Sequence, residues 1–208
     1  LDYAPSKVVG PGSADFKPEG NIEKSKALLE SAKTKCPDNY AKATSTGITI
    51  DVRQSSALND TIPIVEASFA KAGIKVKWNV ISVAYYSTVM NPDKQNDMSA
   101  SGWGADWANA STVIPELFTT AGGFNLTQNA DDANYKAFEG RVNAAMKVTD
   151  RKKQAALWKA LDKEAAGYFW HMPTLFGKAQ EVWGSALQNV FFWVPQGNPA
   201  YGKIWVQQ

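Results

Sequence analysis

Apolar and polar residues alternate in two short stretches of the chain, residues 47–53 and residues 74–82. A period of two is typical of a β-strand that turns one face toward the core. The side chains expected on the inner faces are Ile48, Ile50, Val52, Ile74, Val76, Trp78 and Val80. The side chains expected on the outer faces are Thr49, Asp51, Arg53, Lys75, Lys77 and Asn79.

A helical period lies between these two stretches, in residues 61–73. Its apolar positions are Ile62, Val65 and Phe69. We expect Pro63 in the first helical turn, where proline is tolerated, and Gly73 as the C-cap. A strand, a helix and a strand with short connections predict a βαβ unit, in which the two strands are parallel and the crossover is right-handed.

The remaining pattern predicts further helices and two further strands. Residues 98–104 form a third strand of small residues, and a short helix begins between Thr112 and Pro115. The apolar run 168–176 is expected to be a buried strand that leaves the sheet at Pro173. Other helices are expected over residues 21–33 after the cap Asn21, over residues 83–90, over residues 133–148 with Tyr135, Phe138, Val142 and Met146 inward, and over residues 150–166 with Asp150 as cap and Leu157, Leu161 and Ala165 inward.

These elements together predict an α/β fold with a mostly parallel central sheet flanked by helices. A chain of 208 residues can bury one sizeable core, so we expect a single domain over residues 21–208. Residues 1–20 contain three prolines and three glycines without periodicity, which is typical of an extended arm.

Composition excludes several classes of function. The net charge of +2 comes from interspersed charges, which is not typical of a nucleic-acid-binding face. One cysteine, Cys36, and one histidine, His171, cannot form an internal disulfide or a zinc site of the Cys and His type. No nucleophile elbow or phosphate loop is present, and His171 lies in an apolar run where a core role is the usual one. We therefore expect no enzyme activity, no cofactor and no metal.

The segment MSASGWGADWANAS, residues 98–111, carries the candidate chemistry. Ligands of open α/β sheets bind beyond the carboxyl ends of the strands, where Trp103 and Asp106 are expected. A carboxylate beside an indole ring suits a ligand with a cationic end. The alternative is a structural one: an Asp in such a loop is commonly an N-cap or turn residue, and the pattern alone favours that reading. Trp107 is expected in the core or at the rim.

Residues 102–118, GWGADWANASTVIPELF, resemble the most characteristic segment of the family 5 extracellular solute-binding proteins. Members show a strand that ends in Gly-Trp-x-x-Asp, a polar turn and a short helix with a Leu-Phe pair, here Leu117 and Phe118. The expected helices and strands match the family in order over nearly the whole chain. Two positions depart from the pattern: Asn109 and Ala110 replace the usual Asp-Pro, and Gln154 replaces a common arginine of the closing helix.

The resemblance implies one lobe of a type II periplasmic-binding-protein fold, because members are two-lobed and more than twice this length. It implies a receptor of an ABC uptake system for short peptides, with Asp106 as the anchor of the α-amino group and Trp103 as a wall. The implied ligand-binding residues are Trp103, Gly104, Ala105, Asp106 and Trp107. Implied partners are the membrane permease and an N-terminal lobe of the same parent chain, outside the cytoplasm. Binding of oligosaccharides or other small solutes, or a protein-interaction role, are the alternatives.

Overall fold

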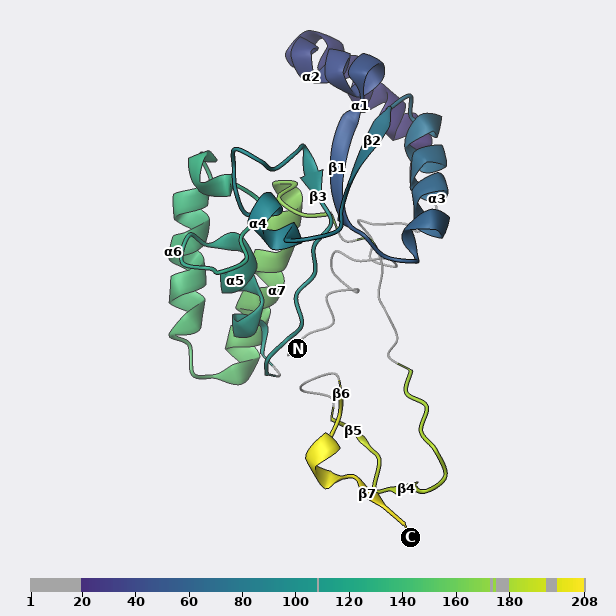
Figure 1. Cartoon of the computed structure of the whole chain (residues 1–208). Helices are drawn as coiled ribbons and strands as arrows, with labels where there is room; N and C mark the ends of the chain where they lie inside the picture. Colours follow the sequence, from purple (N-terminus) through teal and green to yellow (C-terminus); the bar gives the residue numbers. More distant parts are fainter. Residues whose placement is uncertain (1–19, 108, 173, 175–179, 194–197, 208) are drawn as a thin grey trace. The chain divides into compact units, whose positions relative to one another are not determined.

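A computed structural model of the chain describes residues 20–207 except 108, 173, 175–179 and 194–197 (Figure 1). The predicted arm, apart from Gly20, lies outside the described residues. The chain divides into two compact units. We call residues 19–101 the sheet unit, and residues 102–208 belong to the second, which we call the helical unit.

Three parallel strands form the sheet of the first unit (Figure 1). The central strand β1 (Ile48–Arg53) lies between β2 (Val76–Ile81) and the short β3 (Met98–Ser99). The helix α3 (Leu58–Lys71) connects β1 to β2, and the Trp78 indole N–H donates to the Glu66 carboxylate at 2.9 Å. The predicted βαβ unit and its parallel strand pair are thereby confirmed.

The connecting helix begins earlier than predicted. It starts at Leu58, so Pro63 lies inside the helix and not in its first turn. Pro63 cannot donate to the carbonyl oxygen of Asn59, which weakens the helix at that point. Gly73 follows the helix with a φ of +84° and donates to the carbonyl of Ala70 at 2.9 Å, as predicted for the residue that ends it.

The burial of two side chains of the sheet differs from the prediction. Asp51 was expected outside but is fully buried in the central strand. Its carboxylate accepts hydrogen bonds from the Asn79 amide at 2.7 Å and from the Asn96 amide and backbone N–H at 2.6 and 2.8 Å. These three donors replace the water that the carboxylate loses on burial. Val80 was expected inside but is 46% exposed, because β2 is an edge strand.

A buried tyrosine closes the sheet unit near this carboxylate. The Tyr85 hydroxyl bonds to the carbonyl oxygens of Ala100 and Asp51. Burial raises the pKa of Tyr85 to about 12, with a smaller contribution from the negative charge of Asp51.

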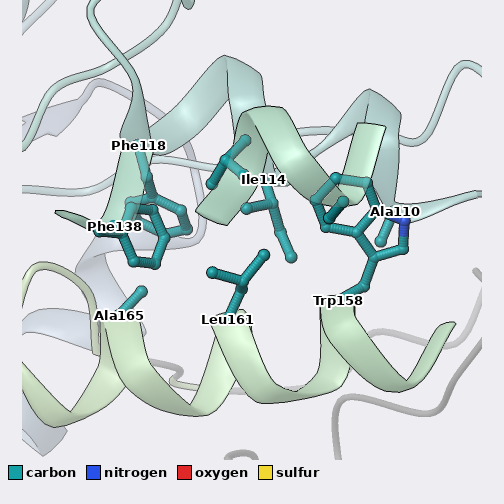
Figure 2. Close-up of a cluster of buried hydrophobic side chains, with 9 residues drawn as sticks. Ala110, Ile114, Phe118, Phe138, Trp158, Leu161 and Ala165 are labelled. Carbon is teal, nitrogen blue, oxygen red and sulfur yellow. The ribbon is translucent and has the colours of Figure 1, made fainter. Parts of the chain in front are cut away.

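The core of the helical unit lies among three helices, α5 (Ile114–Phe118), α6 (Tyr135–Met146) and α7 (Arg151–Gly167). Figure 2 shows that Trp158, Leu161 and Ala165 point from α7 toward the side chains of the facing helices. The buried cluster consists of Ala110, Ile114, Phe118, Phe138, Val142, Ala145, Trp158, Leu161 and Ala165. The predicted inward positions Met146 and Leu157 are instead 48% and 41% exposed, and Trp158 takes the core place beside Leu161.

Two predicted strands are shorter than expected or absent. The third strand covers Met98–Ser99 instead of residues 98–104. The strand predicted from residue 168 is wrong for residues 168–172, since α7 continues to Gly167 and Tyr168 caps it. Phe169 then takes a φ of +59° and is 89% exposed. Pro173 and most of the residues after it in that stretch lie outside the described residues.

The predicted caps Asn21 and Asp150 both accept backbone N–H bonds, from Lys24 and Lys153. Near the C-terminus, antiparallel pairing joins β4 (Leu187–Gln188) to β7 (Trp205–Val206) and β5 (Phe192–Trp193) to β6 (Asn198–Pro199). The remaining elements are α1 (Ile22–Lys35), α2 (Pro37–Ala41), the π-helix Lys42–Thr46, α4 (Tyr85–Val89), and the 3₁₀ helices Ala110–Thr112, Asn129–Asp131 and Tyr201–Lys203.

Within the described residues, no helix combines the length and apolarity that a membrane crossing needs. The same residues contain no cluster of three or more His, Cys, Asp or Glu side chains that could hold a metal ion. Cys36 is a free thiol.

Candidate functional site

The candidate site is an irregular segment of the helical unit, residues 102–107, which precedes the 3₁₀ helix Ala110–Thr112. Asp106, Gly104 and Trp107 are exposed, and Trp103 and Ala105 are half-buried. A Cβ atom added at Gly104 would meet no atom within 4 Å, so the backbone there faces open space. All five predicted ligand-binding residues are therefore on one accessible segment, and their contact with a ligand stays a prediction.

Trp103 is held at its polar end and at its ring. Its indole N–H donates to the backbone carbonyl of Thr112 at 2.7 Å. Its ring centroid lies 4.5 Å from that of Phe124, with the planes inclined at 46°. Because the N–H already has a partner inside the unit, Trp103 can offer a ligand its ring surface but not its hydrogen-bond donor.

Asp106 is held by the same threonine. The Thr112 hydroxyl donates to the Asp106 carboxylate oxygen Oδ2 at 2.6 Å and accepts the Asp106 backbone N–H at 3.2 Å. In the described part of the chain, the other carboxylate oxygen, Oδ1, has no hydrogen-bond partner. The segment therefore presents one uncommitted carboxylate oxygen on an exposed side chain beside a fixed aromatic ring.

Of the structural alternative for Asp106, the helix cap is wrong, and the turn role stays a prediction. The residue that caps the 3₁₀ helix is Asn109, whose side-chain oxygen accepts the Ser111 backbone N–H at 2.8 Å. Asp106 accepts its bond from a hydroxyl group and caps no helix. Trp107 is 52% exposed and donates to the Ser111 hydroxyl at 3.0 Å, so it is not a core residue, and its place at the rim of a site stays a prediction.

A chain of amide hydrogen bonds ties this segment to the helix pair α6 and α7. The Asn109 amide donates to the Gln154 side-chain oxygen at 2.7 Å, and the Gln154 amide donates to the carbonyl of Ala145 at 3.1 Å. Asn109 is buried and Gln154 is half-buried, so these bonds are partly shielded from water. The two positions at which the chain departs from the family pattern thus contact each other.

No role in the site was predicted for Thr112 or Phe124 from the sequence, and Gln154 was named only as a departure from the family pattern. The position of Thr112 at a helix start was a weak indication, because a hydroxyl residue there commonly bonds to nearby backbone and side-chain groups. The contacts of Phe124 with Trp103 and of Gln154 with Asn109 join distant parts of the chain, so no local pattern predicts them.

His171 is neither in a strand nor a satisfied core residue. Its Nε2 atom lies 3.9 Å from the Asp162 carboxylate, too far for a hydrogen bond, and its Nδ1 atom has no partner among the described residues. Its ring packs on Phe118 with centroids 5.0 Å apart. Burial lowers the pKa of His171 and raises the pKa of Asp162 to about 6. In the part of the chain that the structure describes, no polar group aligns the imidazole as a general base.

Comparison with known families places the chain among binding proteins. The profile of the bacterial extracellular solute-binding proteins, family 5, middle region, matches residues 2–125. This match includes the candidate segment and more than half of the chain. A search of curated protein sequences gave no match.

Several solved structures of similar fold are described as oligopeptide-binding proteins or as part of an oligopeptide transporter. Clavulanic acid biosynthesis oligopeptide binding protein 2 aligns with a TM-score of 0.71 and 19% identity over 92% of this chain and 35% of its own. The substrate-binding domain of an oligopeptide ABC transporter from Bacillus anthracis gives 0.68 and 16% identity over 93% of this chain and 36% of its own. AppA from Bacillus subtilis, solved with a nonapeptide, gives 0.61 and 18% identity over 95% of this chain and 40% of its own.

At these identities the likeness establishes the fold. The predicted α/β architecture of a periplasmic-binding-protein lobe is confirmed, with its parallel three-stranded sheet and flanking helices. The chain spans little more than a third of the length of these structures.

Proposed function

Since this chain belongs to the bacterial extracellular solute-binding proteins of family 5, we propose that it forms one wall of a binding site for short peptides. Membership makes the chain a solute-binding protein and not an enzyme. The proposal goes further than membership in naming the ligand class and the residues that contact it.

The observation that carries the proposal is the free oxygen of the Asp106 carboxylate. A carboxylate oxygen on an exposed side chain is a charge-assisted acceptor for an ammonium group, such as the α-amino group of a peptide. The ring pair of Trp103 and Phe124 supplies a flat apolar surface for the adjoining peptide backbone. Gly104 leaves room for that backbone to approach, with Ala105 next to it in the chain, and in this proposal Trp107 lies at the rim.

Two structural relatives support peptides over other solutes. AppA was solved in complex with a nonapeptide, and DppA from Helicobacter pylori was solved in complex with the peptide STSA. For this chain the peptide remains our proposal, because sugars also stack on exposed tryptophan rings.

The second wall, in this proposal, is another lobe of a longer receptor. The matched structures are almost three times as long as the aligned region, so most of each receptor has no counterpart here. Two surface hollows of this chain lie elsewhere, between α6 and α7 and at the start of α3, and neither is lined by a predicted site residue. A hollow away from the predicted site residues is consistent with a site that two lobes enclose, because one lobe alone leaves its half of the ligand surface open.

The exposed aromatic residues near the C-terminus fit this arrangement. Residues 183–205 hold several large side chains that are about half exposed or more, which is unusual for aromatic groups. They are Trp183, Phe191, Phe192, Trp193, Tyr201 and Trp205. We propose that they pack against the other lobe and that the closed receptor delivers its peptide to an ABC permease outside the cytoplasm.

Thermal unfolding of the full-length receptor tests the ligand class. We expect tripeptides with free amino termini to raise the unfolding temperature, since a ligand at a hundred times its dissociation constant adds about 2.7 kcal/mol of stability, or a few degrees. Oligosaccharides of similar size should leave the temperature unchanged. Asp131 is an exposed carboxylate of the same unit that is not among the predicted site residues. Asp131→Asn should therefore keep the wild-type response to peptides and serves as a control.

A shift by oligosaccharides and none by peptides would contradict the proposal. The tryptophan rings would then carry the binding, and Asp106 would have a structural role only.

A further inference from the structure

Two contacts hold the Trp103 ring of the proposed site. Its indole N–H donates to the carbonyl of Thr112, and its ring centroid lies 4.5 Å from that of Phe124. A single hydrogen bond leaves an indole ring free to turn about the direction of that bond. The contact with Phe124 therefore decides which way the Trp103 ring faces.

Phe124 ends a tight turn that follows α5 and folds back on it. The Gly122 N–H donates to the carbonyl of Thr119 at 3.1 Å within this turn. Glu116 of α5 accepts two further N–H groups of the turn, Gly123 at 2.8 Å through its carboxylate and Phe124 at 3.3 Å through its carbonyl. The turn is thus bonded to the helix next to the aromatic residue that it carries.

Gly122 lies directly against the backbone of α5. A Cβ atom built on it would lie 2.5 Å from the carbonyl oxygen of Pro115 and 2.7 Å from the carbonyl carbon of Glu116. Both distances are well inside the ~3.5 Å at which non-bonded carbon atoms pack best. Any other residue at this position would push the turn away from the helix, and Phe124 would move with it.

We propose that the seat of this turn on α5 positions the Trp103 ring for a ligand, with Gly122 and Glu116 as the positioning residues. The inference rests on the proposed function, in which that ring is one wall of the peptide site. Both residues act through Phe124. The helix is a firm support for the turn, because its first and last side chains are buried in the core.

Gly122→Ala tests the seat in the full-length receptor, with one tripeptide titrated in its free-amine and its amino-acetylated form by isothermal titration calorimetry. We expect both affinities to fall by about three- to tenfold, the effect of one aromatic contact, while their ratio keeps the wild-type value. The ratio reports the Asp106 carboxylate, which is held by Thr112, whereas the two affinities also report the ring.

Gly140→Ala is the matched control. It makes the same change in the same unit, at a position where a Cβ atom would meet nothing within 4 Å. It should keep both affinities at their wild-type values.

A second pair of variants applies the test if Gly122→Ala does not fold. Glu116→Ala removes the carboxylate that accepts the Gly123 N–H and should weaken both forms of the tripeptide by the same factor. Glu116→Gln keeps an acceptor oxygen at that place and should restore the wild-type affinities.

Two-dimensional NMR of the 208-residue chain reports on the ring without a ligand. The ring current of Phe124 acts on the indole signals of Trp103 at this distance, so a displaced turn changes them. These signals should move in Gly122→Ala and in Glu116→Ala. They should stay in place in Gly140→Ala and in Glu116→Gln.

Folded variants with wild-type affinities and unmoved Trp103 signals overturn the inference. A collapse of the ratio between the two peptide forms in Gly122→Ala also overturns it, because the turn would then act on Asp106 and not on the ring. If the wild-type receptor binds the acetylated form as tightly as the free amine, or binds neither, the proposed function itself fails. The NMR signals still decide in that case whether the turn holds Trp103.

Discussion

Asp162 is a carboxylate buried on α7 without a hydrogen-bonding partner for its Oδ2 atom among the described residues. Burial raises its pKa to about 6. His171 lies 3.9 Å away but is itself shifted toward its neutral form, so it offers little compensating charge. The ionised form of Asp162 is therefore unfavourable in the folded state.

Stability should depend on pH through this residue. Because the pKa is higher in the folded than in the unfolded chain, Asp162 contributes stability at low pH that is lost as the pH rises through about 6. Asp162→Asn removes this loss, so the variant should gain up to about 3 kcal/mol relative to wild type between pH 4 and pH 8. Urea unfolding at a series of pH values measures the difference.

The pKa shift of His171 changes stability with pH in the opposite direction, and His171 is present in both wild type and Asp162→Asn. Its lowered pKa means that its contribution is lost as the pH falls, so only the difference between the two proteins isolates Asp162. A difference that does not change with pH would show that Asp162 ionises without cost.

Most of the wrong sequence-based predictions concern the burial of single residues. Asp51 follows the outward positions of its strand, and only the donors of Asn79 and Asn96, distant in sequence, make its burial tolerable. Leu157 and Trp158 are adjacent on α7, and the periodicity does not decide which of them meets the core. Burial of such residues depends on packing partners that no local pattern contains.

At the scale of elements, the amide chain of Asn109, Gln154 and Ala145 joins the site segment to α6 and α7. Each amide in the chain has a fixed orientation, because Gln154 must offer its oxygen to Asn109 and its N–H to the Ala145 carbonyl. Reversing the Gln154 amide would bring oxygen against oxygen at Ala145 and N–H against N–H at Asn109.

A charge placed in this chain should destabilise the unit. Asn109→Asp sets a buried carboxylate against the Gln154 oxygen, and we expect a loss of about 1 to 3 kcal/mol in unfolding free energy. Gln154→Arg, added to the first change, supplies a guanidinium partner and should recover most of that loss. Chemical denaturation of the two single variants and the double variant gives the coupling energy.

Additive effects in this cycle would mean that the two side chains do not interact. Asn109→Ser is a suitable control, because it keeps a capping oxygen for Ser111 and introduces no charge.

The elements themselves were largely predictable. Periods of two and of 3.6 located β1, β2, α3, α6 and α7, and the caps Asn21 and Asp150 marked two helix starts. The wrong predictions lie at the ends of elements. Residues 168–172 form a turn and irregular backbone after α7 although their apolar run resembles a strand, and the small residues after Ser99 leave the sheet. An apolar run does not distinguish the two states when its partners are unknown.

At the scale of the whole molecule, the chain combines a small parallel sheet with a helical unit that carries the candidate segment. Family membership and fold were accessible from the ordered motifs of the sequence. The hydrogen bonds of Asp106 could not be predicted from the sequence. Whether its carboxylate caps a helix or keeps a free acceptor oxygen depends on where Thr112 and Asn109 lie in the folded chain.

The most direct test of the central claim is the affinity of the full-length receptor for one tripeptide and its amino-acetylated form, in wild type and in Asp106→Asn, by isothermal titration calorimetry. We predict that wild type binds the free-amine form at least about tenfold tighter, the effect of losing one hydrogen bond to a charged group, and that Asp106→Asn removes the difference. Equal affinities in wild type, or a difference that survives in Asp106→Asn, would contradict the assignment of Asp106 as the ammonium anchor.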